Sequence, residues 1–351
     1  MKYSDNPVLV NEEKVDFRDP KVFWHKQTNK WIMVLAAGDG MDIYSSPNLK
    51  EWHFESSFKG HPGGEMFGVW ECPDLFNLPV EGNPNETKWV LLISHGDKPN
   101  SNYGSRTQYF VGDFDGHSFT NYGSNPKVKW LDSGKDNYAG VSWSDTEDGR
   151  RIYIGWMSNW RYANETPTQG WIGAMTLPRE LFLTSKGMLI EKPIKELEIL
   201  REEPIHIKNQ MLSQEIDFLS KLQGAACEII AEFEFEEAKE FGIKVFKSAK
   251  KETVIGYNVE KEEMYIDRRN SGETSFNRFF SSFDCAVVNT KLSDKIPDRS
   301  SIEVFANKGE IAMTSLIFPD SLSKSLELFS IGGNVKLLSL NVYRLKSICS
   351  S

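Results

Sequence analysis

The chain has 351 residues, 39% of them hydrophobic and 26% charged, which is typical of a globular protein large enough for two domains. Its net charge is −9 and its basic residues form no cluster, which argues against a nucleic-acid-binding protein. The sequence contains no apolar run long enough to cross a membrane and no signal peptide within residues 1–10, which leaves open whether the parent protein is secreted or cytoplasmic.

A weak repeat organises the first half of the chain. Each unit contains an apolar strand, a turn and further short strands rich in aromatic residues, a pattern typical of a β-propeller with long loops. An Asp115-Gly116 turn is predicted in the second unit. The predicted strands are 31–35, 41–45, 52–54, 89–93, 108–114, 139–143 and 151–156.

The pattern changes near residue 200. A short connecting helix is predicted at 193–200, where apolar residues recur at helical spacing. Alternating segments at 229–235, 243–246 and 302–305 then predict a second all-β domain, a sandwich. Four glutamates in this region are interpreted as a solvated strand face: Glu232, Glu234, Glu236 and Glu237. The predicted organisation is a propeller-type domain over 1–190, a connecting segment over 191–203 and a sandwich domain over 204–351.

Two short motifs place a carboxylate among aromatic residues and next to a proline. They are Phe17-Arg18-Asp19-Pro20, just before the first predicted strand, and Trp70-Glu71-Cys72-Pro73-Asp74-Leu75-Phe76. Such surroundings hold a carboxylate rigidly and favour a raised pKa, and cleavage of a glycosidic bond uses a pair of carboxyl groups. On the residues alone, a turn with a local ion pair and a surface glutamate remain the simpler interpretation.

The motifs resemble those of glycoside hydrolase family thirty-two, which contains the invertases, levanases, inulinases and fructan β-fructosidases. The similarity continues in the same order through further segments and covers nearly the whole chain. These segments are Gln108–Gly116, Asp136–Ala139, Gly155–Trp160, Leu177–Leu181, Asp298–Phe305 and Ile317–Pro319.

The resemblance implies an all-β fold, a five-bladed β-propeller followed by a β-sandwich. It also implies a retaining hydrolase that removes fructosyl units from sucrose or from fructans such as levan and inulin. By motif, Glu71 would be the general acid/base and Asp19 the transition-state stabiliser, and both would face one cleft. The residues implied to bind the sugar are Arg18, Asp136, Tyr138 and Trp160, and packing in a core is an equal alternative for Trp160.

Neither a cofactor nor a metal is expected. The four cysteines, Cys72, Cys227, Cys285 and Cys349, lie far apart and form no C-x-x-C pair. The expected partner is the sucrose or fructan substrate, without nucleic acid or membrane. The segment Pro167–Ile172 departs from the pattern of levanase-like members, which leaves the preference between sucrose and polymer open.

The family's nucleophile is missing from this sequence. It belongs to a Trp-Met-Asn-Asp-Pro-Asn-Gly type of motif in the first blade, and no such motif occurs here. The resemblance then implies that the chain starts inside the second blade and that the propeller is incomplete, with about three blades present. A complementing N-terminal fragment would supply the rest. We expect little or no hydrolysis from this chain by itself.

Two other interpretations stay open. The chain would be a non-catalytic remnant that binds sucrose or fructan through Asp19 and Trp160. Alternatively, it would be an inverting glycosidase of a related propeller family, which would need a different base.

Overall fold

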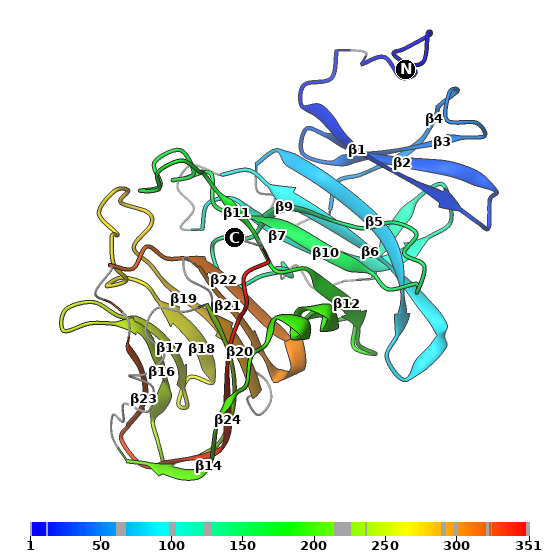
Figure 1. Cartoon of the computed structure of the whole chain (residues 1–351). Helices are drawn as coiled ribbons and strands as arrows, with labels where there is room; N and C mark the ends of the chain where they lie inside the picture. Colours follow the sequence, from blue (N-terminus) through cyan, green and yellow to red (C-terminus); the bar gives the residue numbers. More distant parts are fainter. Residues whose placement is uncertain are drawn as a thin grey trace. The chain divides into compact units, whose positions relative to one another are not determined.

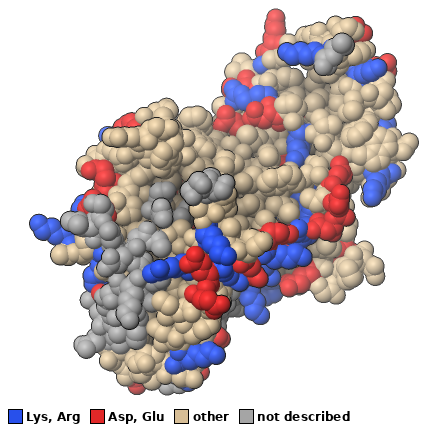
Figure 2. Space-filling model, in the orientation of Figure 1, with Lys and Arg blue, Asp and Glu red and all other residues tan. Residues whose placement is uncertain are grey.

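The computed structural model describes residues 2–348 except 12, 61–67, 98–102, 123–127, 214–225, 236, 289–292, 298–300, 321–322 and 324. Strands dominate the described residues (Figure 1), so the all-β prediction is confirmed. No helix in the described part of the chain is long and apolar enough to span a membrane. Acidic and basic side chains are interspersed over the face drawn in Figure 2.

The chain divides into two compact units whose segments alternate along the sequence. The first unit contains Met1–Leu131, Tyr138–Gly155 and Leu181–Leu189. The second contains Asp132–Asn137, Trp156–Glu180 and Ile190–Ser351. The domain limits drawn from the sequence stay a prediction.

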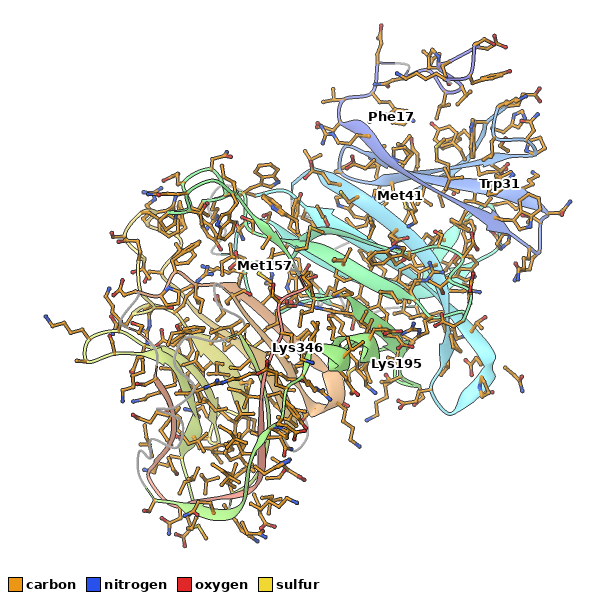
Figure 3. The ribbon with its side chains drawn as sticks, in the orientation of Figure 1. Phe17, Trp31, Met41, Met157, Lys195 and Lys346 are labelled. Carbon is orange, nitrogen blue, oxygen red and sulfur yellow. The ribbon has the colours of Figure 1, made fainter. Side chains whose placement is uncertain are left out.

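The first unit begins with a four-stranded antiparallel sheet in the order β1-β2-β3-β4. Its strands are β1 (Phe17–His25), β2 (Lys30–Ala37), β3 (Met41–Ser46) and β4 (His53–Phe58). Figure 3 labels one residue in each of the first three strands: Phe17 in β1, Trp31 in β2 and Met41 in β3. Both faces of β2 are covered, because Ile32 and Leu35 belong to different apolar clusters. A strand buried on both faces reads as a continuous apolar run, which explains why the sequence predicts β2 well.

A second antiparallel group follows in the order β5-β6-β7-β8. Its strands are β5 (Trp70–Val80), β6 (Asn83–His95), β7 (Arg106–Phe114) and β8 (Phe119–Asn121). The turn predicted at Asp115-Gly116 joins β7 to β8. There the Asp115 carboxylate accepts hydrogen bonds from the N–H groups of His117 and Ser118, at 2.8 and 2.7 Å.

The third group contains five short strands. They are β9 (Tyr138–Ser142), β10 (Ile152–Met157), β11 (Ala174–Met175), β12 (Arg179–Leu183) and β13 (Leu189–Pro193). Strand β9 pairs with β10, and β12 lies parallel to β5 where Leu183 pairs with Val80. The predicted connecting helix is present as the 3₁₀ helix η1 (Lys195–Leu200), none of whose residues is buried.

The C-terminal residues form two antiparallel sheets, as predicted for a sandwich. The six-stranded sheet contains, in order, β14 (Ile205–Leu212), β24 (Val335–Arg344), β15 (Cys227–Phe235), β20 (Ser293–Pro297), β21 (Ser301–Ala306) and β22 (Ile311–Leu316). The five-stranded sheet contains β19 (Phe283–Val287), β18 (Glu263–Asp267), β17 (Thr253–Asn258), β16 (Glu240–Lys247) and β23 (Ser325–Ile331). A short 3₁₀ turn, η2 (Asn307–Gly309), connects β21 to β22.

Alternation along these strands places apolar side chains in one core. Ile229, Ile243 and Val304 belong to this core, while Glu232 and Glu234 are exposed. The prediction of a solvated glutamate face is therefore confirmed for these two residues. Glu237 is also exposed, and Glu236 lies outside the described residues.

One local prediction is wrong. The sequence places Phe17–Pro20 before the first strand, whereas the structure includes these residues in β1. The ladder between β1 and β2 shifts by one residue between Arg18 and Lys21. A proline has no N–H to donate to a ladder, so the sequence around Pro20 does not predict a strand. In the structure a bulge accommodates the proline within β1.

Candidate functional site

The two predicted carboxylates lie in strands that carry the same irregularity. One extra residue is accommodated within Arg18–Lys21 of β1 and, again, within Glu71–Asp74 of β5. In each bulge the residue before the proline has a positive φ, 58° at Asp19 and 50° at Cys72. Backbone strain of this kind, which costs on the order of 1–3 kcal/mol per residue, clusters at functional sites.

A hydrogen bond joins the two bulges. Asp19 Oδ2 accepts the backbone N–H of Cys72 at 3.0 Å, and the Cys72 thiol lies 3.6 Å from the same oxygen. The structure therefore brings the Asp19 carboxylate beside the residue that follows Glu71. Burial, reinforced by the Asp19 charge, raises the pKa of the Cys72 thiol to about 12. This thiol stays protonated at neutral pH and is a poor candidate for a nucleophile.

The Glu71 carboxylate is held at both oxygens. Arg18 Nη1 lies 3.4 Å from Oε1, and the Tyr138 hydroxyl donates a hydrogen bond to Oε2. Burial and the nearby Glu71 charge raise the pKa of Tyr138 well above its usual range, so its hydroxyl remains a donor. The side chain of Glu71 is 25% exposed, so a ligand can reach it. Arg18 is oriented in turn by an ion pair with Asp16.

Strand β9 carries Tyr138, and side chains of other strands form hydrogen bonds with both ends of this strand. The N–H of Ala139 donates to Ser94 Oγ at 3.0 Å. At the other end, the N–H and the hydroxyl of Ser142 both donate to Asp74 Oδ2, at 2.6 and 2.7 Å. Asp74 is fully buried and is the last residue of the bulge that carries Glu71. The same bulge therefore fixes Glu71 and, through β9, the tyrosine that orients it.

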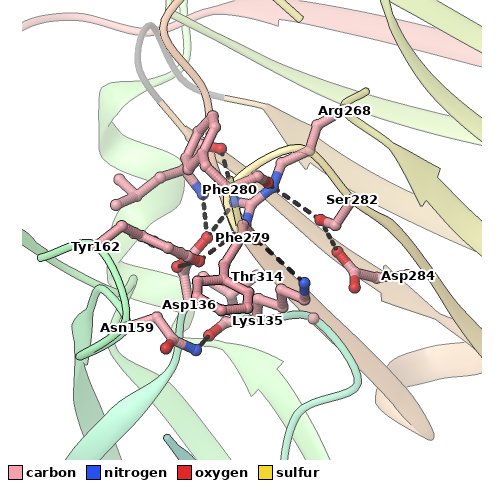
Figure 4. A network of polar contacts seen from close by, with 12 residues as sticks. Lys135, Asp136, Asn159, Tyr162, Arg268, Phe279, Phe280, Ser282, Asp284 and Thr314 are labelled. Carbon is pink, nitrogen blue, oxygen red and sulfur yellow. Dashed lines mark hydrogen bonds and ion pairs between the residues drawn. The ribbon is translucent and has the colours of Figure 1, made fainter. Parts of the chain in front are cut away.

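Asp136 belongs to the second unit and is fully buried there. Its Oδ1 accepts the Tyr162 hydroxyl, and its Oδ2 accepts Arg268 Nη1 and the N–H of Leu316 (Figure 4). Both carboxylate oxygens are thus occupied by protein donors. The predicted contact of Asp136 with a sugar finds no support in this geometry, whereas Tyr138, two residues later, does lie at the Glu71 site.

Arg268 is the centre of that buried network. Its Nη2 donates to the Tyr162 hydroxyl at 2.8 Å, and its Nε donates to the carbonyl of Phe280 at 2.8 Å and to Ser282 Oγ at 2.9 Å. Burial alone would lower the pKa of Arg268, but the charges of Asp136 and Asp284 and the contact with Tyr162 together outweigh it, and the pKa lies above its usual range. The pair is a structural ion pair whose hydrogen-bonding groups are satisfied by protein.

Trp160 lies on the surface of the second unit, where 50% of it is exposed. Its ring centroid is 4.9 Å from that of Trp156, at an interplanar angle of 58°. A side chain this exposed is not packed in a core, so the packing alternative is wrong for Trp160. The contact of Trp160 with a sugar stays a prediction.

Sequence reasoning missed the residues that hold the site together. Asp16, Ser94 and Asp74 contact the predicted residues or the strand that carries them, but none is itself a ligand candidate. Only Asp16 gives a signal in the sequence, because it lies two residues from Arg18 and carries the opposite charge. The contacts of Ser94 and Asp74 depend on a strand more than forty residues away in the chain.

Family models match both halves of the chain. The glycosyl hydrolases family 32 N-terminal domain matches residues 1–193, and the family 32 C-terminal domain matches residues 196–344. The chain belongs to glycosyl hydrolase family 32. The resemblance found in the sequence is therefore confirmed.

Several relatives of this family 32 chain are known. It is 47% identical over 360 residues to a levanase of Bacillus subtilis (strain 168), with 99% of this chain and 53% of the levanase covered. It is 35% identical to an extracellular exo-inulinase of Aspergillus awamori, with coverages of 97% and 68%. The chain thus spans about half the length of the levanase.

Solved structures support the same fold. The exo-inulinase of Aspergillus awamori has a TM-score of 0.86 at 32% identity, covering 97% of this chain and 71% of that one. A fructofuranosidase of Schwanniomyces occidentalis, complexed with fructose, has a TM-score of 0.87 at 27% identity, with coverages of 99% and 74%. The predicted fold class, strands of a propeller-type domain followed by a β-sandwich, is confirmed.

Proposed function

We propose that the Asp19–Glu71 site binds a fructosyl unit of sucrose or of a fructan and belongs to a retaining β-fructosidase. The observation that carries the proposal is the hydrogen bond from the Cys72 N–H to Asp19, which joins the two motifs beside Glu71. The levanase and exo-inulinase relatives support a fructan as the substrate class.

Each residue of the site has a role in this proposal. Glu71 protonates the leaving glycosidic oxygen and later takes a proton from the attacking water. Asp19 accepts hydrogen bonds from fructose hydroxyls and stabilises the positive charge that develops on the ring. Tyr138 and Arg18 keep the Glu71 carboxylate in one orientation, since each contacts one of its oxygens.

Hydrolysis also requires a nucleophile, which this sequence does not provide in the family's motif. We propose that this chain alone binds the fructosyl unit but hydrolyses it slowly or not at all, and that a fragment carrying an Asn-Asp-Pro-Asn-Gly motif restores the reaction. Cys72 is no substitute, because its pKa of about 12 keeps it protonated. A binding protein without catalysis is the second candidate, and the missing motif is the observation that favours it.

Binding of fructose tests the site independently of catalysis. Asp19→Asn removes the charge that faces the sugar and should weaken binding about tenfold or more in isothermal titration calorimetry, since hydrogen bonds to a charged group are the stronger kind. Asp39→Asn is the matched control, because Asp39 is an exposed carboxylate whose partner is Lys59. Equal affinity of Asp19→Asn and wild type, or no measurable binding by wild type, would count against the proposal.

A further inference from the structure

The second unit carries a cleft that the proposed function does not use. It has a volume of about 360 Å³ and lies on the face of the five-stranded sheet that points away from the sandwich core. In β16, Phe241 and Ile243 point into the core, so Glu240 and Lys244 point outward into the cleft. The volume falls within the range of about 300–1,000 Å³ found for small-ligand pockets. The strands β16 to β19 and β23 that form the sheet are labelled in Figure 1.

A glycine in β17, Gly256, makes room for an aromatic ring that lines the cleft. Gly242 and Gly256 pair with one another across β16 and β17, and both occupy outward positions. The ring of Tyr265 lies over Gly256, where an added Cβ would be only 2.3 Å from ring atoms. The Tyr265 hydroxyl donates a hydrogen bond to Glu240. A flat aromatic ring resting on backbone therefore forms part of the floor.

The lining carries charges of both signs in nearly equal numbers. Some of them pair with one another, as Lys244 does with Glu252 at 3.6 Å and Arg269 with Asp267 at 2.7 Å. Others are available: among the described residues, the Lys261 ammonium and the Glu263 carboxylate have no ion-pair partner within 4 Å. A balanced lining does not select a strongly charged ligand, but its donors and acceptors suit a neutral polar one.

An exposed aromatic ring borders these polar groups. Phe283 is 45% exposed, and its ring lies against that of Tyr265, with centroids 4.8 Å apart and an interplanar angle of 22°. Ile331, which is 55% exposed, adds apolar surface from β23. A sugar chain presents C–H surfaces alternating with hydroxyl groups, so apolar contact beside free donors and acceptors is what it requires.

We propose that this cleft is a second, non-catalytic binding site for a neutral oligosaccharide. The assignment of that sugar as a fructan rests on the proposed function, because a protein that acts on a polymer gains retention from a second contact with the same chain. The described residues contain no group of three metal-ligating side chains, so a cation is not the proposed ligand.

Affinity electrophoresis of the whole chain in gels containing levan tests the proposal, with dextran gels as the control polymer. Levan should retard the wild type, and dextran should not. Phe283→Ser should weaken the affinity for levan about tenfold, because it removes the exposed ring. Val287→Ser is the matched control and should behave as wild type: Val287 is 57% exposed, lies in the same strand with the same outward alternation and does not line the cleft.

Further variants separate this cleft from the Asp19–Glu71 site. Glu263→Gln should also weaken retardation, while Asp19→Asn should leave it in place. Retardation lost in Asp19→Asn but kept in Phe283→Ser would overturn the proposal, because the polymer would then be held at the first site. No retardation of wild type, unchanged retardation of Phe283→Ser, or equal retardation by dextran would overturn it as well. Fructose binding by Phe283→Ser shows whether the first site is intact.

Discussion

Among single residues, Asp136 is the one for which a structural role and a role in sugar binding lead to different expectations. Its carboxylate is the anionic partner of Arg268, and both side chains are fully buried. Asp136→Asn leaves a buried guanidinium without its counter-charge, which we expect to lower the free energy of unfolding by about 3–5 kcal/mol. Thermal and urea unfolding measure this loss. Asp284→Asn is the control: Asp284 accepts a hydrogen bond from Ser282 of the network, and its charge acts on Arg268 less strongly than that of Asp136, so its loss should cost less.

Fructose binding distinguishes the two roles. If the role of Asp136 is structural, the folded fraction of Asp136→Asn should bind fructose with the affinity of the wild type. A variant of unchanged stability that loses fructose binding would contradict this account and restore Asp136 to the sugar pocket.

The sequence distinguishes these residues only in part. The sequence singles out Asp19 and Glu71 as candidates because each lies in a short motif with an aromatic residue and a proline, and the roles that the family resemblance gives them stay a prediction. Asp136 and Tyr138 lie in one motif and could not be told apart, because their partners are remote. Asp136 contacts Arg268 and Leu316, whereas Tyr138 contacts Glu71. These partners are distant in the chain, so the residues around the motif do not predict either contact.

At the scale of elements, one buried arginine ties together side chains from four strands. Arg179 of β12 contacts Glu191 of β13 at 2.7 Å, Glu303 of β21 at 2.6 Å and Thr314 of β22. Asp132 lies 3.0 Å from the same guanidinium, so three carboxylates share one cation. Burial raises the pKa of Glu191 to about 7, although Arg179 opposes this shift.

This cluster predicts a dependence of stability on pH. The pKa of Glu191 is higher in the folded state than its ordinary value of 4.5, so the folded state binds the proton more tightly. The stability contributed by this proton is present below about pH 4.5 and is lost as the pH rises to about 7. Glu191→Gln cannot titrate and should flatten the fall in melting temperature between these values. Glu237→Gln, at an exposed position, is the control. Identical pH profiles of Glu191→Gln and wild type would contradict the assignment.

The elements differ in how far the sequence predicts them. Strand β2 and the sandwich strands β15, β16 and β21 have regular apolar patterns, and the sequence locates them. The starts of β1 and β5 contain a proline and a residue of positive φ, so they read as loops although they carry the site. Local rules fail at these two bulges because contacts remote in the chain sustain the strain.

At the scale of the whole molecule, composition and repeats predict the fold class well. Long runs of apolar residues indicate the propeller-type strands, and strict alternation indicates the sandwich. The two compact units are less predictable, since segments such as Asp132–Asn137 group with the second unit although their neighbours belong to the first. This grouping depends on contacts between residues that are far apart in the sequence, so it cannot be predicted from any short segment.

We have proposed that this chain binds a fructosyl unit at Asp19 and Glu71 and that fast turnover needs a nucleophile from the family's Asn-Asp-Pro-Asn-Gly type of motif, which this sequence does not contain. The most direct test measures reducing-sugar release from levan and sucrose by the wild-type chain beside its Glu71→Gln variant. We expect neither protein to release sugar above background, because Glu71 and Asp19 do not replace a nucleophile on the opposite face of the anomeric carbon. Robust release by the wild type that disappears in Glu71→Gln would show a complete catalytic site and contradict the claim.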